Sequence, residues 1–353
     1  MAQIAVIPGD GIGREVIDQG LRVLKHLDAI HGLDLNFTEL DYGAERYLRD
    51  GITITADEMQ ALGNDYDAVF LGALGDPRVP SNIHAKEILL GARFQLDLYV
   101  NYRPCKLLDS RYTPLKDCDP EDISFVVFRE NTEGLYTGVG GQFKRGTADE
   151  IAIEAEMNTR KGVERIIRAA FEHAKTHNLS RMCMSDKSNA MRHGHDLWQR
   201  VYKEVAAEYP NIESRHLYVD VLTMEMVRAP NQFDVIVTNN LFGDIVTDLG
   251  AQLQGGIGLA ASGNLHPGKC ALFEPVHGSA PTIAGQGIAN PMAAILTSGM
   301  LLSWLGQNKL ESQIEHAVGA CLHADEVTAE LGGNLSTSEV GDAVLRELDK
   351  LNP

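Results

Sequence analysis

The fold of this chain follows from NNLFGDIVTDLGAQLQGGIGLAASG, which occupies residues 239–263. Directly before it stands FDVIVT, residues 233–238, a short apolar and β-branched run that predicts a buried strand. The apolar spacing around Asp244 and Asp248 predicts a helix after that strand. Strand followed by helix recurs along the chain, which is typical of a parallel α/β sheet.

Asp244 and Asp248 are four residues apart, so a helix places both carboxylates on one face, one turn apart. The ordinary interpretation of such a pair is a solvated acidic face. Here the surrounding positions are apolar, Ile245 and Val246 among them, and the pair follows the end of a strand, where α/β sheets place ligands. These features favour a Mg²⁺ or Mn²⁺ site with oxygen ligands.

Length and charge restrict the classes of protein. A chain of 353 residues, 44% hydrophobic and 23% charged, is long enough for two domains with ordinary globular cores. The net charge of −18 argues against nucleic acid, whose phosphates it would repel. An anionic substrate needs only a local basic pocket and stays compatible with that charge.

The five cysteines are scattered, without a CxxC pair or ligand-like spacing, which indicates free thiols in a reducing compartment. The chain shows no signal-peptide pattern and no apolar run long enough to span a bilayer. We therefore expect a cytoplasmic protein.

Alternating strand-like and helix-like runs continue along the chain without a linker-like segment, which suits two domains joined by several crossings. A glycine-rich excursion over residues 136–158 is interpreted as an arm of strands. Strands are expected at residues 3–7, 35–40, 66–71, 96–104, 123–129, 181–185, 214–219 and 233–238. Helices are expected at residues 14–30, 56–62, 85–96, 159–177, 194–209 and 293–305, with two more near the C-terminus.

Three arginines, Arg93, Arg103 and Arg129, stand at or near the ends of apolar runs. Each alone is typical of a surface ion pair, but together, near a metal site, they suit a substrate with two carboxylates. Tyr136 and Lys187 are candidate acid and base groups, although a lone Tyr or Lys is usually structural or solvated.

Two glycine-containing turns are candidates for cofactor contacts. GDGIG at residues 9–13 has the spacing GxGxG rather than GxGxxG, so it does not predict a Rossmann site. HGSAP at residues 277–281 offers backbone N–H groups that a phosphate can approach, or forms a plain turn.

Several motifs occur in order along nearly the whole chain: IPGDGIGREV (7–16), RENTEGLYTG (129–138), DKSN (186–189), NNLFGDIVTDL (239–249), GGIGLAASGN (255–264), EPVHGSAP (274–281) and GIANP (287–291). By these motifs the chain resembles the decarboxylating β-hydroxyacid dehydrogenases. The resemblance implies a large twisted α/β sheet of non-Rossmann type in two domains. Residues 1–100 with 255–353 would form the cofactor side and carry both termini. Residues 101–254 would form the substrate and metal side, with an arm at a dimer interface.

Within that family the chain is most similar to the isopropylmalate branch. In KEILLGARFQLD (86–97), Ile88, Leu89 and Leu90 offer an apolar wall suited to an isopropyl group, where isocitrate-acting members carry a serine in a polar segment. Lys86 departs from the glutamate that many isopropylmalate members have. The resemblance implies NAD-dependent oxidative decarboxylation of (2R,3S)-3-isopropylmalate in leucine biosynthesis. Tartrate or D-malate, and homoisocitrate, are the alternative substrates. A silent regulatory subunit is disfavoured because such subunits tend to lose the tyrosine, the lysine or a metal aspartate.

The resemblance also implies a role for each site residue. Arg93, Arg103 and Arg129 would clamp the malate carboxylates beside Leu89 and Leu90, and Tyr136, Lys187 and Asp220 would be catalytic. Asp220, Asp244 and Asp248 would bind Mg²⁺ or Mn²⁺. Lys187 and Asp220 would come from the partner subunit, which implies a homodimer with shared active sites.

The cofactor implied by the resemblance is NAD. Thr282 stands where NAD-using members commonly have Asp, and the Lys-Tyr pair of NADP-using members is absent, so NAD stays favoured. The implied cofactor contacts are Ile12, Gly75, Asn189, Glu274, His277, Gly278, Ser279, Ala280, Thr282, Ile283 and Asn290.

Overall fold

The structure, a computed structural model, describes residues 1–352, which form two units. Unit 1 comprises Met1–Leu98, Lys106–Pro120 and the residues from Ala251 onward, and unit 2 comprises Tyr99–Cys105 and Glu121–Gly250. Residues 99–100, which the sequence placed in the first domain, belong to unit 2, and residues 251–254, which it placed in the second, belong to unit 1. Residues 106–120, also placed in the second domain, cluster with unit 1 as well. The contacts explain this, because Lys106 pairs with Glu315 (Nζ–Oε2, 2.6 Å) within that unit.

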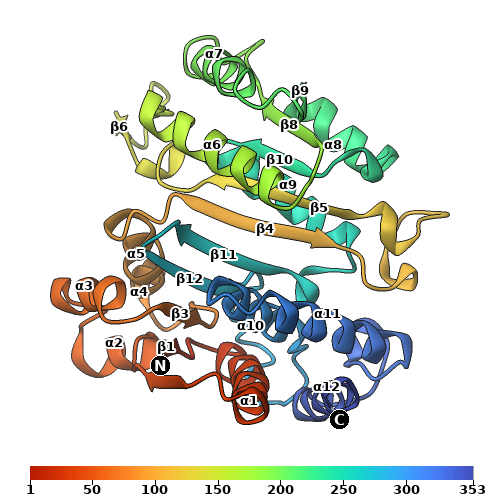
Figure 1. The fold of residues 1–353 in the computed structure, drawn as a ribbon. Coiled ribbons are helices and arrows are strands. Elements are labelled where there is room, and N and C mark those ends of the chain that lie inside the picture. The colour runs from red at the N-terminus through yellow and green to blue at the C-terminus, as the bar shows by residue number, and fades with distance from the viewer. Residues whose placement is uncertain (353) are drawn as a thin grey trace. The chain divides into compact units, whose positions relative to one another are not determined.

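In unit 1 the strands follow the order β2-β1-β3-β12-β11 (Figure 1). Strand β1 is parallel to β2 and β3, and β3 is parallel to β12. Strands β11 and β12 form an antiparallel pair that the sequence patterns did not predict. The strands are β1 (Ala2–Ile7), β2 (Leu35–Glu39), β3 (Ala68–Leu71), β11 (Ala261–His266) and β12 (Cys270–Pro275). The helices are α1 (Gly13–His31), α2 (Ala44–Asp50), α3 (Ala56–Asn64), α10 (Met292–Trp304), α11 (Asn308–His323) and α12 (Thr337–Leu351), with short turns η1 (Pro80–Asn82), η3 (Ser110–Tyr112), η7 (Ile257–Leu259) and η8 (Ala329–Leu331).

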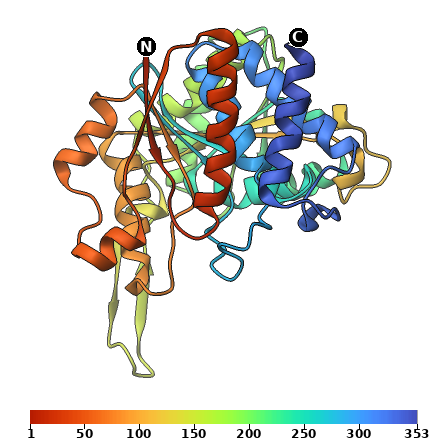
Figure 2. The ribbon, with the colours of Figure 1, turned by 90° about the horizontal axis from the view of Figure 1, so that it is seen from below.

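Local sequence explains where these helices begin. Thr55 and Glu58 form a capping box at the start of α3, and Ser336 and Glu339 form another at α12. Helix α10 is apolar on nearly all sides because it is buried, packing against α1 and α11. Figure 2 shows α1 and α12 lying side by side along this unit.

The segment expected as one helix over residues 85–96 is irregular. It consists of α4 (Ile83–Ala85), a π-helical turn η2 (Lys86–Leu90) and α5 (Gly91–Gln95). Ile88, expected on the apolar wall, is instead fully buried in the core of unit 1. Because that core takes Ile88, Leu89 and Leu90 are left half-buried.

In unit 2 the strands follow the order β4-β5-β10-β8-β9, with β10 parallel to β5 and β8, and β8 parallel to β9. These pairings and those of unit 1 confirm the expected α/β class with mostly parallel strands. The strands are β4 (Val100–Lys106, whose last residue belongs to unit 1), β5 (Ser124–Glu130), β8 (Arg181–Asp186), β9 (Glu213–Tyr218) and β10 (Val235–Thr238). The helices are α6 (Arg160–Thr176), α7 (Gly194–Ala206), α8 (Val219–Arg228) and α9 (Asn240–Leu253), with short turns η4 (Pro120–Asp122), η5 (Leu135–Thr137) and η6 (Pro230–Gln232).

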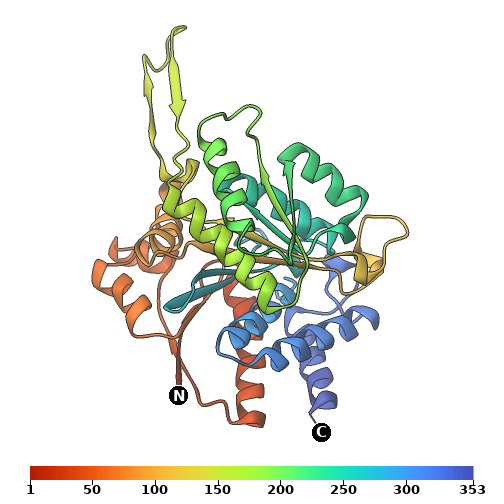
Figure 3. The ribbon, with the colours of Figure 1, turned by 45° about the horizontal axis from the view of Figure 1, so that its top comes forward.

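The glycine-rich excursion is a two-stranded antiparallel hairpin of β6 (Gly140–Phe143) and β7 (Ile151–Glu154). This confirms the expected arm of strands. Figure 3 shows it projecting from the rest of unit 2. Phe143, Ile151 and Ile153 are exposed on this arm. Exposed apolar surface of this kind is typical of interaction sites.

Two further observations concern the whole described chain. All five cysteines are free, and four of them are buried. Among residues 1–352, no helix combines the length and the apolar character that crossing a membrane requires.

Candidate active site

The first group of site residues lies where β5 and β10 end side by side in unit 2. Arg129 pairs with Thr238 in the β5–β10 register, and α9 begins two residues after Thr238. The parallel register therefore places the guanidinium of Arg129 beside the first turns of α9, at the carboxyl ends of the strands.

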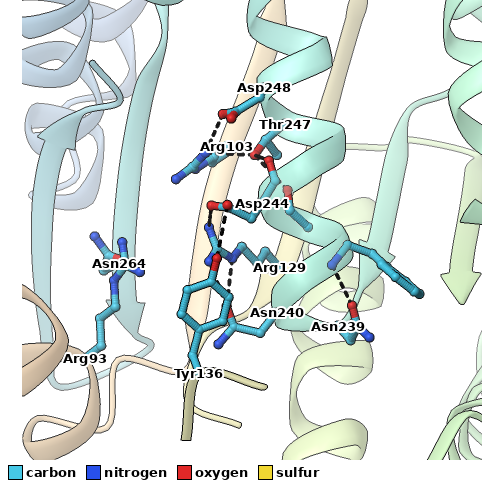
Figure 4. Close-up of polar contacts among 12 residues, drawn as sticks. Arg93, Arg103, Arg129, Tyr136, Asn239, Asn240, Asp244, Thr247, Asp248 and Asn264 are labelled. Carbon is cyan, nitrogen blue, oxygen red and sulfur yellow. Dashed lines mark hydrogen bonds and ion pairs between the residues drawn. The ribbon is translucent and has the colours of Figure 1, made fainter. Parts of the chain in front are cut away.

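Arg129 is buried and fixed by several partners (Figure 4). Its Nη1 donates to Asp244 Oδ1 at 2.5 Å, and its Nε and Nη2 donate to Asn240 Oδ1 at 3.0 and 2.8 Å. Tyr136, on the turn η5, donates its hydroxyl to Asp244 Oδ2 at 3.1 Å, and its ring lies 5.3 Å from the Arg129 guanidinium carbon. The structure thus brings together three of the residues singled out in the sequence: Arg129, Tyr136 and Asp244.

Arg103 and Asp248 extend this cluster by one helical turn. Arg103, on β4, donates Nη1 to Thr247 Oγ1 at 2.8 Å and lies 3.8 Å from Asp248 Oδ1. The side chain of Asp248 is 62% exposed and that of Asp244 is 38% exposed. Burial and the charge of Asp244 raise the pKa of Asp248, against the opposing effect of Arg103 and Arg129. Two carboxylates one helical turn apart supply oxygen ligands of the kind that a hard divalent cation takes.

The third expected metal ligand, Asp220, belongs to a separate pair. It lies in the first turn of α8, and its Oδ1 accepts a hydrogen bond from Lys187 Nζ at 2.5 Å. The Lys187 ammonium lowers the pKa of Asp220 below its ordinary value. Within the part of the chain that the structure describes, no group of three or more His, Cys, Asp or Glu side chains is placed to hold a metal ion. One chain therefore offers Asp244 with Asp248, and Lys187 with Asp220, as two distinct pairs.

Arg93 lies in unit 1, where it has a carboxylate partner. Its Nη2 donates to Glu274 Oε1 at 3.1 Å, and Asn264 Nδ2 donates to the same oxygen at 2.8 Å. Its Nε is buried without a hydrogen-bond partner. Glu274, expected as a cofactor contact, is thus the counter-ion of the buried Arg93, whose Nε–H stays available as a donor.

A cavity of about 430 Å³ in unit 1 contains six of the expected cofactor residues: Ile12, His277, Gly278, Ala280, Ile283 and Asn290. His277 Nε2 and Asn290 Nδ2 are buried there without a hydrogen-bond partner. Burial lowers the pKa of His277, which favours its neutral ring. Its Nδ1 donates to the Gly278 carbonyl at 3.1 Å, so in that neutral ring Nε2 carries no proton and can accept a hydrogen bond. Unpaired buried polar atoms are costly, and both atoms fit a flat heteroaromatic ligand with hydrogen-bonding edges.

Sequence reasoning missed the other residues of this cavity: Ile257, Gly258, Ile288, Ala289 and Glu330. The motifs GGIGLAASGN and GIANP contain four of them, but nothing in the local sequence points to Glu330. A Cβ atom at Gly258 would lie 2.5 Å from Glu330 Oε2 and 2.8 Å from Asn290 Nδ2. Glycine at this position therefore keeps the cavity open.

The remaining expected cofactor residues do not line the cavity. Gly75 donates its N–H to Asp10 Oδ2 at 2.8 Å, and Ser279 accepts at its carbonyl from Ile12 N at 2.9 Å. Thr282 is exposed in unit 1 and Asn189 is exposed in unit 2. Gly75 and Ser279 thus support the turn that carries Ile12, while roles for Thr282 and Asn189 stay predictions.

Comparison with known proteins identifies the family of the chain. The family profile described as isocitrate/isopropylmalate dehydrogenase matches residues 3–344. The proteins named 3-isopropylmalate dehydrogenase of Thermobifida fusca and Corynebacterium efficiens are 47% and 48% identical to the chain. The first match covers 98% of this chain and 97% of the relative, and the second covers 97% and 98%.

Solved structures give the same result. The isocitrate dehydrogenase from Methylococcus capsulatus superposes with a TM-score of 0.88 at 34% identity, covering 99% of both chains. A β-decarboxylating dehydrogenase from Thermococcus kodakarensis superposes with a TM-score of 0.82 at 37% identity, covering 99% of this chain and 97% of its own.

Proposed function

The chain belongs to the isocitrate/isopropylmalate dehydrogenase family, and from this premise we propose that it is an NAD-dependent decarboxylating 3-isopropylmalate dehydrogenase. Its reaction would convert (2R,3S)-3-isopropylmalate to 2-oxo-4-methylpentanoate, a step of leucine biosynthesis in the cytoplasm. The observation that carries the proposal is identity of 47% to a relative of that name, over 98% of this chain. The half-buried Leu89 and Leu90 support an apolar substituent on the substrate.

The arginines would hold the substrate by its carboxylates. Arg103 and Arg129 are buried at the edge of the Asp244–Asp248 cluster, and Arg93 retains a buried donor at Nε. Guanidinium groups fixed by neighbours lose little freedom on binding, so they can orient a dicarboxylate at low entropic cost.

The cation and the cofactor each have candidate residues. Asp244 and Asp248, with Asp220 of the partner subunit, would hold Mg²⁺ or Mn²⁺, and the cavity around His277 and Asn290 would hold the adenosine part of NAD. When bound, NAD accepts a hydride from C2 of the substrate, and the cation polarises the C2 oxygen.

The chain's own groups would move the protons. Lys187, paired with Asp220, would first release its own ammonium proton to water, and its neutral amine would then receive the proton of the C2 hydroxyl as the hydride leaves. The product of that step carries a carboxylate β to a ketone, so CO₂ can depart and leave its bonding electrons in an enolate. Tyr136 would then donate its hydroxyl proton to C3. Its hydrogen bond to Asp244 Oδ2, a proposed cation ligand, supports this role.

A homodimer would complete the site. Within one chain Lys187 pairs with Asp220 while Asp244 pairs with Arg129, and a second copy would bring both carboxylate groups to one substrate. Apolar side chains exposed on the arm and on α8 and α9, among them Phe143, Met224 and Ile245, support an extensive contact between copies.

The test is a panel of substrates with the purified protein, NAD and Mg²⁺. We expect the highest kcat/KM with 3-isopropylmalate, against D-malate, tartrate, isocitrate and homoisocitrate in parallel. A higher value with any of the other four would contradict the substrate assignment while leaving the family chemistry in place.

A further inference from the structure

His195 is a buried histidine that the proposed reaction does not use. It lies in the first turn of α7, with none of its side chain exposed. Its ring meets three segments of unit 2: the loop after β8 that carries Lys187, the end of the arm at Glu156, and the residue before α9, Asn239. No pattern in the sequence singles it out.

The hydrogen bonds determine the tautomer of His195. The backbone N–H of Lys187 lies 2.7 Å from Nδ1, and because a backbone amide only donates, Nδ1 must accept and carry no proton. Nε2 then carries the proton of the neutral ring and donates to the Glu156 carboxylate at 3.2 Å. The imidazole therefore connects a carboxylate on one side to the main chain of Lys187 on the other.

Glu156 is itself held in place. Asn239 Nδ2 donates to Glu156 Oε1 at 2.8 Å, and Asn239 Oδ1 accepts from Phe242 N at 2.8 Å, which determines the orientation of the Asn239 amide. The edge of the Phe242 ring packs against the imidazole at a centroid distance of 5.5 Å. The start of the helix that carries Asp244 thus orients the carboxylate that orients His195.

The loop leaves Lys187 with little other freedom. Its carbonyl accepts from Met191 N at 2.8 Å, and the carbonyl of Met191 accepts from His195 N at 3.2 Å. The Lys187 N–H is the remaining backbone group, and His195 Nδ1 is its acceptor. Removing that acceptor would leave the Lys187 backbone N–H without a hydrogen-bond partner and would allow its peptide plane to rotate.

We propose that His195 is a positioning residue for Lys187: its buried neutral ring, oriented by Glu156, fixes the Lys187 backbone and so places the amine beside Asp220. The inference rests on the proposed role of Lys187 in proton transfer. Because none of the His195 side chain is exposed, its role is to act through Lys187.

The test compares His195→Asn with His195→Leu. Asparagine keeps an acceptor close to the place of Nδ1, whereas leucine fills the space without one. We expect amide hydrogen exchange in residues 186–191 to rise at least about tenfold in His195→Leu, because the amide loses its acceptor. We expect kcat to fall about 10- to 100-fold, since displacement of about 1 Å at a reacting group has that effect. The KM for NAD should stay unchanged, and His195→Asn should stay within about threefold of wild type in every measurement.

A matched control is His173→Leu, which replaces another histidine of unit 2, one whose ring packs against Tyr102, Phe128 and His177. It should lower the melting temperature without changing exchange in residues 186–191 or kcat. Equal losses in His195→Asn and His195→Leu, or unchanged exchange in His195→Leu, would overturn the positioning role. Should His195→Leu fail to fold, Glu156→Ala removes only the orienting carboxylate, and unchanged exchange and kcat in that variant would equally overturn it.

The exchange measurement also separates this inference from the proposed function. An enzyme inactive on all five substrates would contradict the proposed function, yet the exchange of the Lys187 amide would still report whether His195 holds it. Normal activity with an unchanged Lys187 amide would contradict the positioning role alone.

Discussion

Gly243 provides a sharp test of how α9 places Arg129. A Cβ atom at this position would lie 2.4 Å from Arg129 Cγ, 2.6 Å from Cβ and 3.0 Å from Cδ. Carbon atoms in contact are ordinarily about 3.5–4.0 Å apart, so Gly243→Ala requires the stem of Arg129 or the helix to move by about 1 Å. Arg129 is 1% exposed and has little room to yield.

The expected effects on stability and on activity differ in size. Alanine gains about 1 kcal/mol over glycine in a helix interior, whereas overpacking costs about 1–3 kcal/mol. The net loss of folding free energy is thus about 0–2 kcal/mol, which a protein of this size can tolerate. A guanidinium displaced by about 1 Å should lower kcat/KM about 100-fold, because substrate orientation is that sensitive to position.

The assay measures kcat, KM for 3-isopropylmalate and thermal unfolding in Gly243→Ala and in Gly299→Ala. The control places the same change inside helix α10, where the added Cβ would meet its nearest atoms at 3.5 and 3.6 Å, an ordinary contact. The control should keep wild-type kinetics. A folded Gly243→Ala enzyme with kcat/KM within threefold of wild type would refute the close packing of α9 against Arg129 as the means of positioning it.

Three further predictions concern the metal, the subunits and the cofactor. Asp248→Asn should strongly weaken the Mg²⁺ dependence of activity, and an unchanged metal titration would count against Asp248 as a ligand. Mixing Tyr136→Phe and Lys187→Ala homodimers should restore activity after subunit exchange, because one site of each heterodimer then has both groups; inactive, verified heterodimers would exclude a shared site. Thr282→Asp should raise the NAD/NADP ratio of kcat/KM about 15-fold, since a carboxylate about 5 Å from a doubly charged 2′-phosphate repels it by about 1.7 kcal/mol in a water-like dielectric. An unchanged ratio at fixed salt would mean that residue 282 does not face the ribose.

The sequence predicted the elements whose signal is local. FDVIVT contains β10, which begins two residues later than expected, and the apolar spacing after it corresponds to α9. A buried strand and an amphipathic helix both show their pattern within a few residues. Helices α2 and α8 were missed because they are short, at seven and ten residues, and a periodic pattern is hard to recognise over so few positions. The β11–β12 pair was missed because its strands are buried among other elements, and their sequence lacks the alternation of a half-exposed hairpin.

The residues of the candidate site likewise fall into those that local sequence predicts and those that only the fold brings together. Asp244 and Asp248 were predicted from their spacing, because one helix carries both. The Lys187–Asp220 and Arg93–Glu274 pairs join residues far apart in the chain, and only the fold brings such partners together. His195 and Glu330 carry no sequence signal for the same reason, since their contacts depend entirely on tertiary packing.

The charges around α9 show why cation and substrate should bind together on the proposed function. Arg103 and Arg129 face Asp244 and Asp248, so in the chain alone two positive groups oppose two carboxylates. A divalent cation alone would leave this partly buried cluster with excess positive charge, and a dicarboxylate alone would leave it with excess negative charge. Uncompensated charge is costly where water is partly excluded, whereas both ligands together restore the balance. By linkage each ligand must then raise the affinity for the other by the same factor. The dissociation constant for Mg²⁺, measured with and without 3-isopropylmalate, should therefore fall when the substrate is present, and equal values would contradict the charge balance as the source of the coupling.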